Sequence, residues 1–255
     1  MRRLIAFPCE GETLVGTLDD APGTTGVLIV SGGNEIRSGA HRGMAMLAQR
    51  LADTGVPVFR YDRRGIGDSS GENGGYLTAR PDLDAAAAAF RSAAPHVTRV
   101  IGFGNCDAAS TLALFGRSAG IDRIVLANPW LVEPIDDLPP AAAIRDRYRT
   151  ALRDPATWRR VLAGDVSFRK LIRGLRRLAT SPSEQETPLA ARVLSAIAGW
   201  QGDAAIVLAR GDATAIAFAA AAGEAVETET IDTASHSFAG AAGAALEATI
   251  RRNLA

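Results

Sequence analysis

Near its middle the chain reads Val100-Ile101-Gly102-Phe103-Gly104-Asn105-Cys106-Asp107-Ala108-Ala109-Ser110. This run predicts a buried strand that turns sharply into a helix. A side chain at the tip of such a turn stands above the sheet, and the flanking backbone segments run so close that only small residues fit two positions away. Gly104 and Ala108 meet that demand around Cys106. The pattern is that of a nucleophile elbow, G-x-S-x-G, with sulfur in place of oxygen and alanine in place of the second glycine.

Length and composition favour one α/β domain with room for an insertion. The chain has 255 residues, 47% of them hydrophobic, and a formal net charge of zero. This charge balance gives no indication of nucleic-acid binding. The two cysteines, Cys9 and Cys106, are too few for a disulfide framework, and Cys9 is expected to be a small buried residue.

Neither a targeting segment nor a cofactor site is expected. Residues 1–10 lack an apolar stretch of signal-peptide length, and no uncharged apolar run of about 18 residues occurs. We therefore expect no membrane span and a cytoplasmic location, where a reducing environment keeps a thiol free. The histidines lack metal-ligand spacing, and no phosphate-binding P-loop is present.

Strands and helices alternate on both sides of the central turn. Residues 2–9 and 12–19 are expected to form a hairpin. We expect further strands at 26–30, 56–61, 98–103, 123–127, 205–209 and 225–231, and helices at 40–54, 81–93, 107–117, 214–222 and 238–253. The continuous apolar run 26–30 is typical of a strand covered on both faces. This rhythm predicts a mostly parallel sheet flanked by helices, with ligand sites at the carboxyl ends of the strands.

A nucleophile at Cys106 needs a general base and an acid that orients it. Of the three histidines, only His236 lies in a short loop between the last expected strand and the last helix. Asp212 directly follows the strand at 205–209 and is the preferred acid. Asp232, four residues before His236, is the alternative. The other histidines are expected at the surface, or with their hydrogen bonds satisfied.

Two backbone amides are expected to stabilise the oxyanion that forms when a carbonyl is attacked. The first is the N–H of Asp107, immediately after the nucleophile. The second should come from the Gly-rich turn 31–34, where either Gly33 or Asn34 supplies it. The Asp107 carboxylate opposes formation of a thiolate next to it, whereas the helix N-terminus and a protonated His236 favour it.

With these motifs in this order, the chain resembles the α/β-hydrolase family over nearly its whole length. The loop 61–71 is similar to the D-x-R-G-x-G-x-S segment after the fourth strand of that family. A cysteine in the elbow resembles the dienelactone hydrolase branch. The run 106–110, with the long variable insert, resembles the exosortase A system-associated hydrolases, which are encoded beside bacterial exopolysaccharide and protein-sorting genes. The resemblance implies an α/β-hydrolase fold and a triad of Cys106, His236 and Asp212.

The chemistry expected of such a triad is acyl transfer through a thioester acyl-enzyme. A thiolate displaces a plain alkoxide poorly, so thioesters, lactones and activated esters are the expected substrates. The partner is therefore a small-molecule acyl substrate, free or linked to coenzyme A or a carrier. A hydrolase is the preferred activity, and the alternatives are an acyltransferase that uses the same acyl-enzyme and a non-catalytic binding protein of the same fold.

Residues 130–200 interrupt the alternation and are expected to form a helical cap between the core segments 1–129 and 201–255. Between 141 and 180, eleven Arg or Lys residues stand against three Asp. Such a segment either attracts an anionic partner, such as a phosphopantetheine carrier, a coenzyme A ester or an acidic lipid, or forms a solvated helical face. Trp130 and Trp158 could wall an acyl pocket, with core packing as the alternative.

The sequence disfavours nucleotide binding as the function of this turn. Gly102-x-Gly104 after a strand resembles the start of G-x-G-x-x-G, but Asp107 occupies the position of the third glycine. Its carboxylate would repel a pyrophosphate. The oligomeric state stays open.

Overall fold

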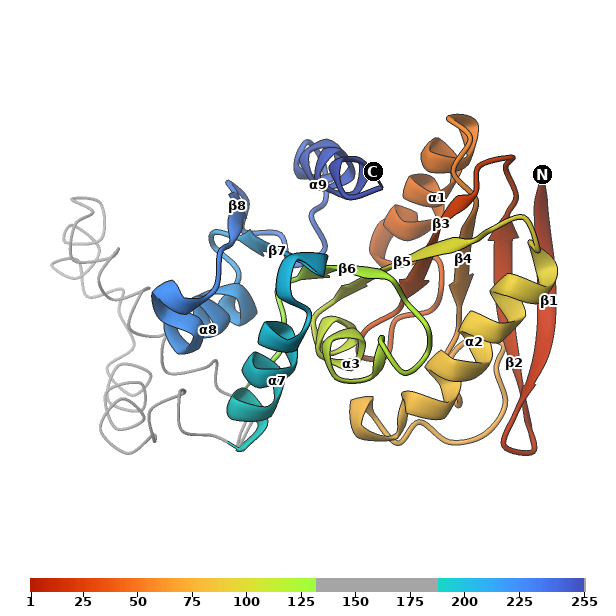
Figure 1. Ribbon diagram of the computed structural model, residues 1–255, viewed down its shortest axis with the longest axis horizontal. Helices are drawn as coiled ribbons and strands as arrows, with labels where there is room; N and C mark the ends of the chain where they lie inside the picture. Colours follow the sequence, from red (N-terminus) through yellow and green to blue (C-terminus); the bar gives the residue numbers. More distant parts are fainter. Residues whose placement is uncertain (132–187, 255) are drawn as a thin grey trace, which may run out of the picture.

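The computed structural model of the protein describes residues 1–131 and 188–254, and within them eight strands form one sheet (Figure 1). The strand order is β1-β2-β4-β3-β5-β6-β7-β8. β1 pairs antiparallel with β2, and β2 with β4, while all other neighbours are parallel. The strands are β1 (Arg2–Cys9), β2 (Glu12–Asp19), β3 (Thr25–Val30), β4 (Val58–Tyr61), β5 (Arg99–Asn105), β6 (Arg123–Ala127), β7 (Ala204–Ala209) and β8 (Glu229–Ile231).

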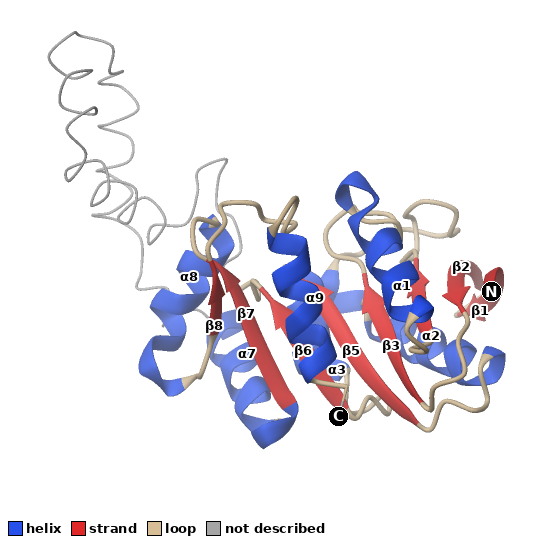
Figure 2. Cartoon of the chain, turned by 90° about the horizontal axis from the view of Figure 1, so that it is seen from above, coloured by secondary structure: helices blue, strands red, loops and turns tan. Residues whose placement is uncertain are grey.

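Helices cover both faces of this sheet, as the sequence predicts. They are α1 (Gly43–Asp53), α2 (Arg80–Ala93), α3 (Asp107–Phe115), α7 (Pro188–Gly199), α8 (Ala213–Ala222) and α9 (Ala242–Arg252). α1 and α9 lie on one face and in front of the strands in Figure 2, whereas α2, α3, α7 and α8 lie on the other.

The core lies on the two sides of the parallel strands. Along β3, Val27 and Ile29 pack with α1 and α9, while Leu28 and Val30 pack with the opposite helices. This alternation follows from the two-residue period of a strand. It confirms that the apolar run at 26–30 is a strand covered on both faces.

Several helices and strands are shorter than predicted, and the local backbone geometry explains where they begin or end. The segment 40–54 begins with a 3-10 turn in which His41 has a φ of +51°, so the α-helix starts at Gly43. Gly223 ends α8 at a φ of +57°, and a 3-10 turn follows, which leaves only Glu229–Ile231 as strand β8. Phe238 is buried with a φ of +54°, so α9 begins only at Ala242.

Within the segment 130–200, residues 188–199 form α7, which belongs to the layer of helices on one face of the sheet. In α7, Leu189, Val193 and Ile197 are buried in the same cluster as α3. Trp200, which directly follows α7, also contacts α3, because its indole N–H donates to the carbonyl of Ala113 at 3.0 Å. Residues 132–187 of the predicted cap, which include its basic stretch and Trp158, lie outside the described residues.

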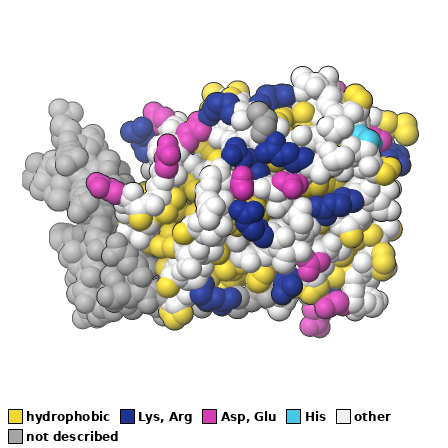
Figure 3. All heavy atoms as spheres, in the orientation of Figure 1, with side chains coloured by type: hydrophobic (Ala, Val, Ile, Leu, Met, Phe, Trp, Pro, Cys, Tyr) yellow, Lys and Arg dark blue, Asp and Glu magenta, His cyan; other side chains and the backbone are white. Residues whose placement is uncertain are grey.

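On the face shown in Figure 3, basic and acidic side chains lie interspersed. No helix in this part of the chain combines the length and the apolar character that a membrane crossing requires.

A glycine at the central turn gives a first prediction. A Cβ on Gly104 would lie 2.8 Å from the carbonyl carbon of Ala108 and 2.9 Å from its oxygen. Because both neighbours are backbone atoms, Gly104→Ala is expected to lower the free energy of unfolding by about 1–3 kcal/mol. Urea denaturation measures this, with Gly199→Ala as the control, since a Cβ there meets nothing within 4 Å. Equal effects of the two substitutions would contradict the tight packing of the turn.

Candidate active site

Cys106 lies at the tip of the turn from β5 into α3. Its φ and ψ are 61° and −128°, a conformation that costs a non-glycine residue about 1–3 kcal/mol and that is typical of functional sites. A backbone hydrogen bond joins the turn to the neighbouring strand, because the Cys106 N–H donates to the carbonyl of Ala127 in β6 at 3.0 Å. The thiol is free and only partly buried. The strand-to-helix turn predicted from the sequence is therefore present.

His236 lies in the loop between β8 and α9, with its backbone anchored under the turn. The amides of Asn105 and Asn128 both donate to the His236 carbonyl, at 3.0 and 3.2 Å. Asn128 in turn accepts the N–H of Ala209 at 2.8 Å. Neither asparagine was predicted from the sequence as part of the site. Their signal is positional, since Asn105 precedes the nucleophile and Asn128 directly follows β6.

Asp212 orients the His236 ring. Its Oδ1 lies 2.9 Å from Nδ1 of His236, and its Oδ2 accepts the N–H of Ala215 at 3.0 Å, which caps α8. One carboxylate therefore serves both as helix cap and as partner of the imidazole. Asp232, the alternative acid, is exposed and lies 3.4 Å from Arg210.

These contacts determine the protonation of the site. Hydrogen bonds to the Asp212 carboxylate and, second, to the Cys106 side chain raise the pKa of His236 to about 10, against the opposing effect of burial. Burial alone would raise the pKa of Asp212, but its hydrogen bond and charge interaction with His236 hold that pKa below its ordinary value. At neutral pH the imidazole is therefore protonated between a carboxylate and the sulfur.

The turn 31–34 packs tightly against the start of α3. A Cβ on Gly32 would lie 2.5 Å from the Asn105 carbonyl oxygen and 2.8 Å from Oδ1 of Asp107. Gly33 was one of the two candidates for the second oxyanion donor. Its N–H instead donates to Oδ1 of Asp107 at 2.6 Å. Among the described residues, the N–H groups of Asn34 and Asp107 have no hydrogen-bond partner.

The Asp107 carboxylate is not an isolated charge beside the thiol. Nη1 of Arg63 lies 3.1 Å from its Oδ2, and both side chains are largely buried. The Asp107 carboxylate therefore has a guanidinium partner that the sequence did not predict.

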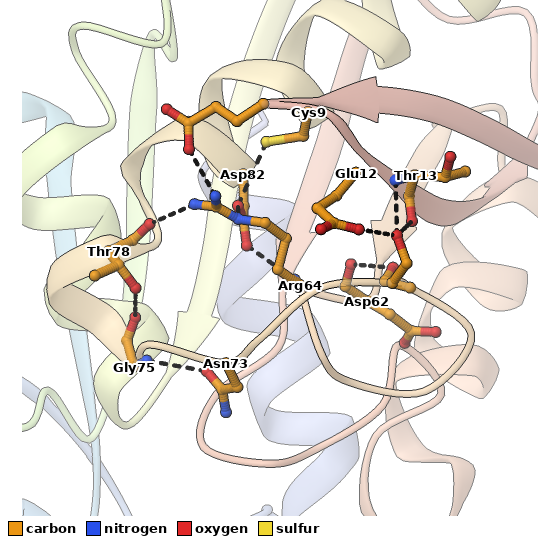
Figure 4. A network of polar contacts seen from close by, with 12 residues as sticks. Cys9, Glu12, Thr13, Asp62, Arg64, Asn73, Gly75, Thr78 and Asp82 are labelled. Atoms are coloured by element: carbon orange, nitrogen blue, oxygen red, sulfur yellow. Dashed lines mark hydrogen bonds and ion pairs between the residues drawn. The ribbon is translucent and has the colours of Figure 1, made fainter.

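The other arginine of the 61–71 loop braces that loop (Figure 4). Arg64 donates to the Asp82 carboxylate through its backbone N–H at 2.9 Å and through Nε at 2.5 Å, and to Glu10 at 2.6 Å. The Cys9 thiol lies 3.5 Å from the same carboxylate. Cys9 is buried, as expected, and burial followed by the Asp82 charge raises the pKa of its thiol to about 11, which disfavours the reactive thiolate.

Ser110 and Trp130 lie near the turn, and each has a defined partner. Ser110 is fully buried and its hydroxyl donates to the carbonyl of Trp130 at 2.6 Å, so it cannot act as a nucleophile. Trp130 is partly buried, and its ring meets that of Tyr76 edge-on with centroids 5.1 Å apart. Among the described residues, no group of three His, Cys, Asp or Glu is placed to hold a metal ion.

The chain is similar to known proteins both in sequence and in fold. The sequence model described as "Alpha/beta hydrolase family" matches residues 27–249. A search of curated proteins finds no match. An esterase of Pyrococcus furiosus is similar in structure, with a TM-score of 0.64 at 14% identity over 100% of this chain and 90% of the other. The thioesterase domain of the curacin biosynthetic pathway has a TM-score of 0.59 at 15% identity, covering 98% and 99%.

A third similar structure is that of XC6422 from Xanthomonas campestris, described as a serine hydrolase without a lid. Its TM-score is 0.59 at 12% identity, over 99% of this chain and 93% of that one. At such low identities these likenesses show a shared fold.

Proposed function

The chain belongs to the α/β-hydrolase family, and on that premise we propose that it hydrolyses activated acyl compounds with Cys106 as the nucleophile. The observation that carries the proposal is the placement of His236, whose Nδ1 lies 2.9 Å from Asp212 and whose pKa is raised by its interactions with Asp212 and, second, with Cys106 at the strained turn. An esterase and a thioesterase domain among the similar structures support acyl transfer as the chemistry.

Acylation begins with the thiol proton on His236. The Cys106 sulfur attacks the acyl carbon and forms a tetrahedral intermediate, whose oxyanion is stabilised by the N–H groups of Asp107 and Asn34. The intermediate collapses when the bond to the leaving group breaks, and His236 gives its proton to that group. The product is a thioester on Cys106 and a neutral imidazole.

Deacylation needs a general base, and acylation itself creates one. Once the sulfur carries an acyl group, one of the two contacts that raise the pKa of His236 is lost. The pKa of His236 is then lower than in the free enzyme, so the imidazole stays neutral after acylation and is available to accept a proton from the attacking water. The water attacks the thioester, the Cys106 thiolate leaves, and Asp212 holds Nδ1–H throughout.

The sulfur nucleophile favours activated substrates. A thiolate leaves a tetrahedral carbon more easily than an alkoxide, so the intermediate formed from a plain alkyl ester reverts to substrate. Thiols, enols and phenols are better leaving groups, which favours thioesters, lactones and aryl esters. Coenzyme A and carrier thioesters fall in this class.

A comparison of leaving groups tests the proposal. With one acyl group throughout, kcat/KM is expected to be far higher for an N-acetylcysteamine thioester and a p-nitrophenyl ester than for the ethyl ester. Product release is followed by absorbance or by thiol titration. Equal values for all three compounds would contradict attack by sulfur.

The pH dependence of acylation follows from the imidazolium. Because the leaving group takes its proton from His236, whose pKa is raised to about 10, kcat/KM is expected to fall as the pH rises through about 10. In Cys106→Ser the imidazole must instead accept the hydroxyl proton, and one of the contacts that raise its pKa is weakened. The rate of that variant should rise with pH, through a lower pKa. The same falling limb in both proteins would exclude a thiolate–imidazolium pair.

Substitution of the two candidate acids separates their roles. Asp212→Asn is expected to lower kcat/KM by about 10²–10⁴-fold, because an amide has one acceptor for the two donors, His236 Nδ1–H and the Ala215 N–H. Asp232→Asn, which alters an exposed ion pair with Arg210, should leave kcat/KM within about twofold. A larger loss at Asp232 would reverse the assignment.

The biological setting is proposed from resemblance alone. The run 106–110 leads us to place the substrate in exopolysaccharide or protein-sorting chemistry, as for the exosortase A system-associated hydrolases. A cytoplasmic, reducing location suits the free thiol of Cys106.

A further inference from the structure

A closed ring of hydrogen bonds joins three segments beside the nucleophile. The Gly33 N–H donates to Oδ1 of Asp107 at 2.6 Å, and Nη1 of Arg63 lies 3.1 Å from Oδ2 of the same carboxylate. The other guanidinium nitrogen of Arg63, Nη2, donates to the Gly33 carbonyl. Gly33, in the turn after β3, is therefore held at both its N–H and its C=O.

The second of these contacts sets the direction of the next amide. The Gly33 carbonyl and the Asn34 N–H belong to one planar peptide, which is trans, so they point to opposite sides. A guanidinium on the carbonyl therefore turns the Asn34 N–H away from Arg63 and leaves it without a partner among the described residues. Gly33 has a φ of +53° and no Cβ, so the backbone itself restrains this peptide weakly.

The ion pair is placed to act on both candidate oxyanion donors. Asp107 supplies the first of them from its own backbone, while its side chain and Arg63 hold the peptide that supplies the second. The Arg63 side chain is 3% exposed and that of Asp107 12%, so the interaction is shielded from water and geometrically restricted. A Cβ on Gly32 would lie 2.8 Å from Oδ1 of Asp107, which shows how closely the segments meet.

We propose that Arg63 and the Asp107 carboxylate are positioning residues that orient the Asn34 N–H toward the oxyanion. This inference rests on the proposed acyl transfer by Cys106. It goes beyond it by assigning a function to the arginine in the loop after β4 and to the side chain that follows the nucleophile. Without the ring, the Gly33–Asn34 peptide is free to rotate and present its carbonyl to the substrate.

Arg63→Lys tests the proposal. A lysine keeps the charge, but its single ammonium cannot bridge carboxylate and carbonyl with the fork geometry of a guanidinium. Acylation by p-nitrophenyl acetate forms an oxyanion, whereas alkylation of the thiol by iodoacetamide displaces iodide at a saturated carbon and forms none. The acylation rate is expected to fall by about 10²-fold, through kcat rather than KM, while the alkylation rate stays within about twofold.

A matched control is available in Arg60→Lys. Arg60 is equally buried and also bridges a carboxylate and a carbonyl, those of Asp19 at 3.1 Å and Arg37 at 2.8 Å. Both lysine variants should lose comparable stability toward urea, but only Arg63→Lys should separate acylation from alkylation. Should it fail to fold, Asp107→Asn keeps an acceptor for Gly33 and removes the charge, and it should show the same separation.

Each alternative outcome has one meaning. An unchanged acylation rate in Arg63→Lys, an equal loss of both rates, or the same separation in Arg60→Lys would overturn this inference while leaving Cys106 as nucleophile. A wild-type protein that p-nitrophenyl acetate does not acylate on Cys106 would overturn the proposed function, and this inference with it.

Discussion

Cys106→Ala is expected to lower kcat/KM for p-nitrophenyl acetate by about 10⁴-fold or more, the scale seen when a covalent nucleophile is removed. The hydroxyl that follows the elbow by one helical turn does not offer a substitute. Ser110 is fully buried, and its hydroxyl is bound to the Trp130 carbonyl. Steady-state release of p-nitrophenolate measures the loss, and the initial burst should disappear together with it.

Cys9→Ala is the matched control for this substitution. Its thiol is buried beside Asp82, far along the sheet from the elbow, and the raised pKa keeps it unreactive. We expect unchanged kcat/KM and a loss of about 1 kcal/mol in the free energy of unfolding, a typical value for a small buried side chain. Retained activity in Cys106→Ala, or a large loss of activity in Cys9→Ala, would remove Cys106 from the mechanism.

The second large effect is expected for His236→Gln, with a loss of about 10²–10⁴-fold in kcat/KM. Glutamine can still contact Asp212, but it carries no proton to give to the leaving group. The loop should stay in place, because Asn105 and Asn128 hold the backbone carbonyl of residue 236 and not its ring. Turnover of the N-acetylcysteamine thioester at several pH values measures the loss, and the fall in kcat/KM above about pH 10 should disappear with it.

His96→Gln controls for the loss of an imidazole elsewhere. His96 is exposed, and its ring contacts only the Ala21 carbonyl, at 2.8 Å, among the described residues. Its substitution should leave kcat/KM unchanged. If His236→Gln were as active as this control, another group would have to move the proton.

Much of this arrangement could be predicted because its signals are local. The apolar run of β3 and the small residues around Cys106 follow from the burial of a strand and the crowding of a sharp turn. The assignment of Cys106, Asp212 and His236 used the alternation of strands and helices together with the chain order typical of an α/β-hydrolase triad. The strand and the turn are present in the structure, and some elements are shorter than predicted where residues such as Phe238 take a left-handed conformation.

The parts that escaped prediction depend on contacts between distant residues. Gly33 and Asp107 are 74 positions apart, and Arg63 and Asp107 are 44 apart. From the sequence alone, Asp107 is a carboxylate next to a thiol, and its negative charge is expected to oppose formation of the thiolate. In the fold, Arg63 compensates that charge, and the carboxylate takes up the N–H of Gly33. No sequence pattern indicates that two side chains so far apart share one hydrogen-bonded ring.

The central claim is that the Cys106 sulfur carries the acyl group during turnover. Intact-mass spectrometry after rapid acid quench of the protein with an N-acetylcysteamine thioester tests it most directly, with peptide mapping to locate the adduct. We predict a mass increase of one acyl group per chain, on the peptide that contains Cys106 and absent from Cys106→Ala. Turnover with Cys106 unmodified at every quench time, or an acyl group on another residue, would contradict the claim.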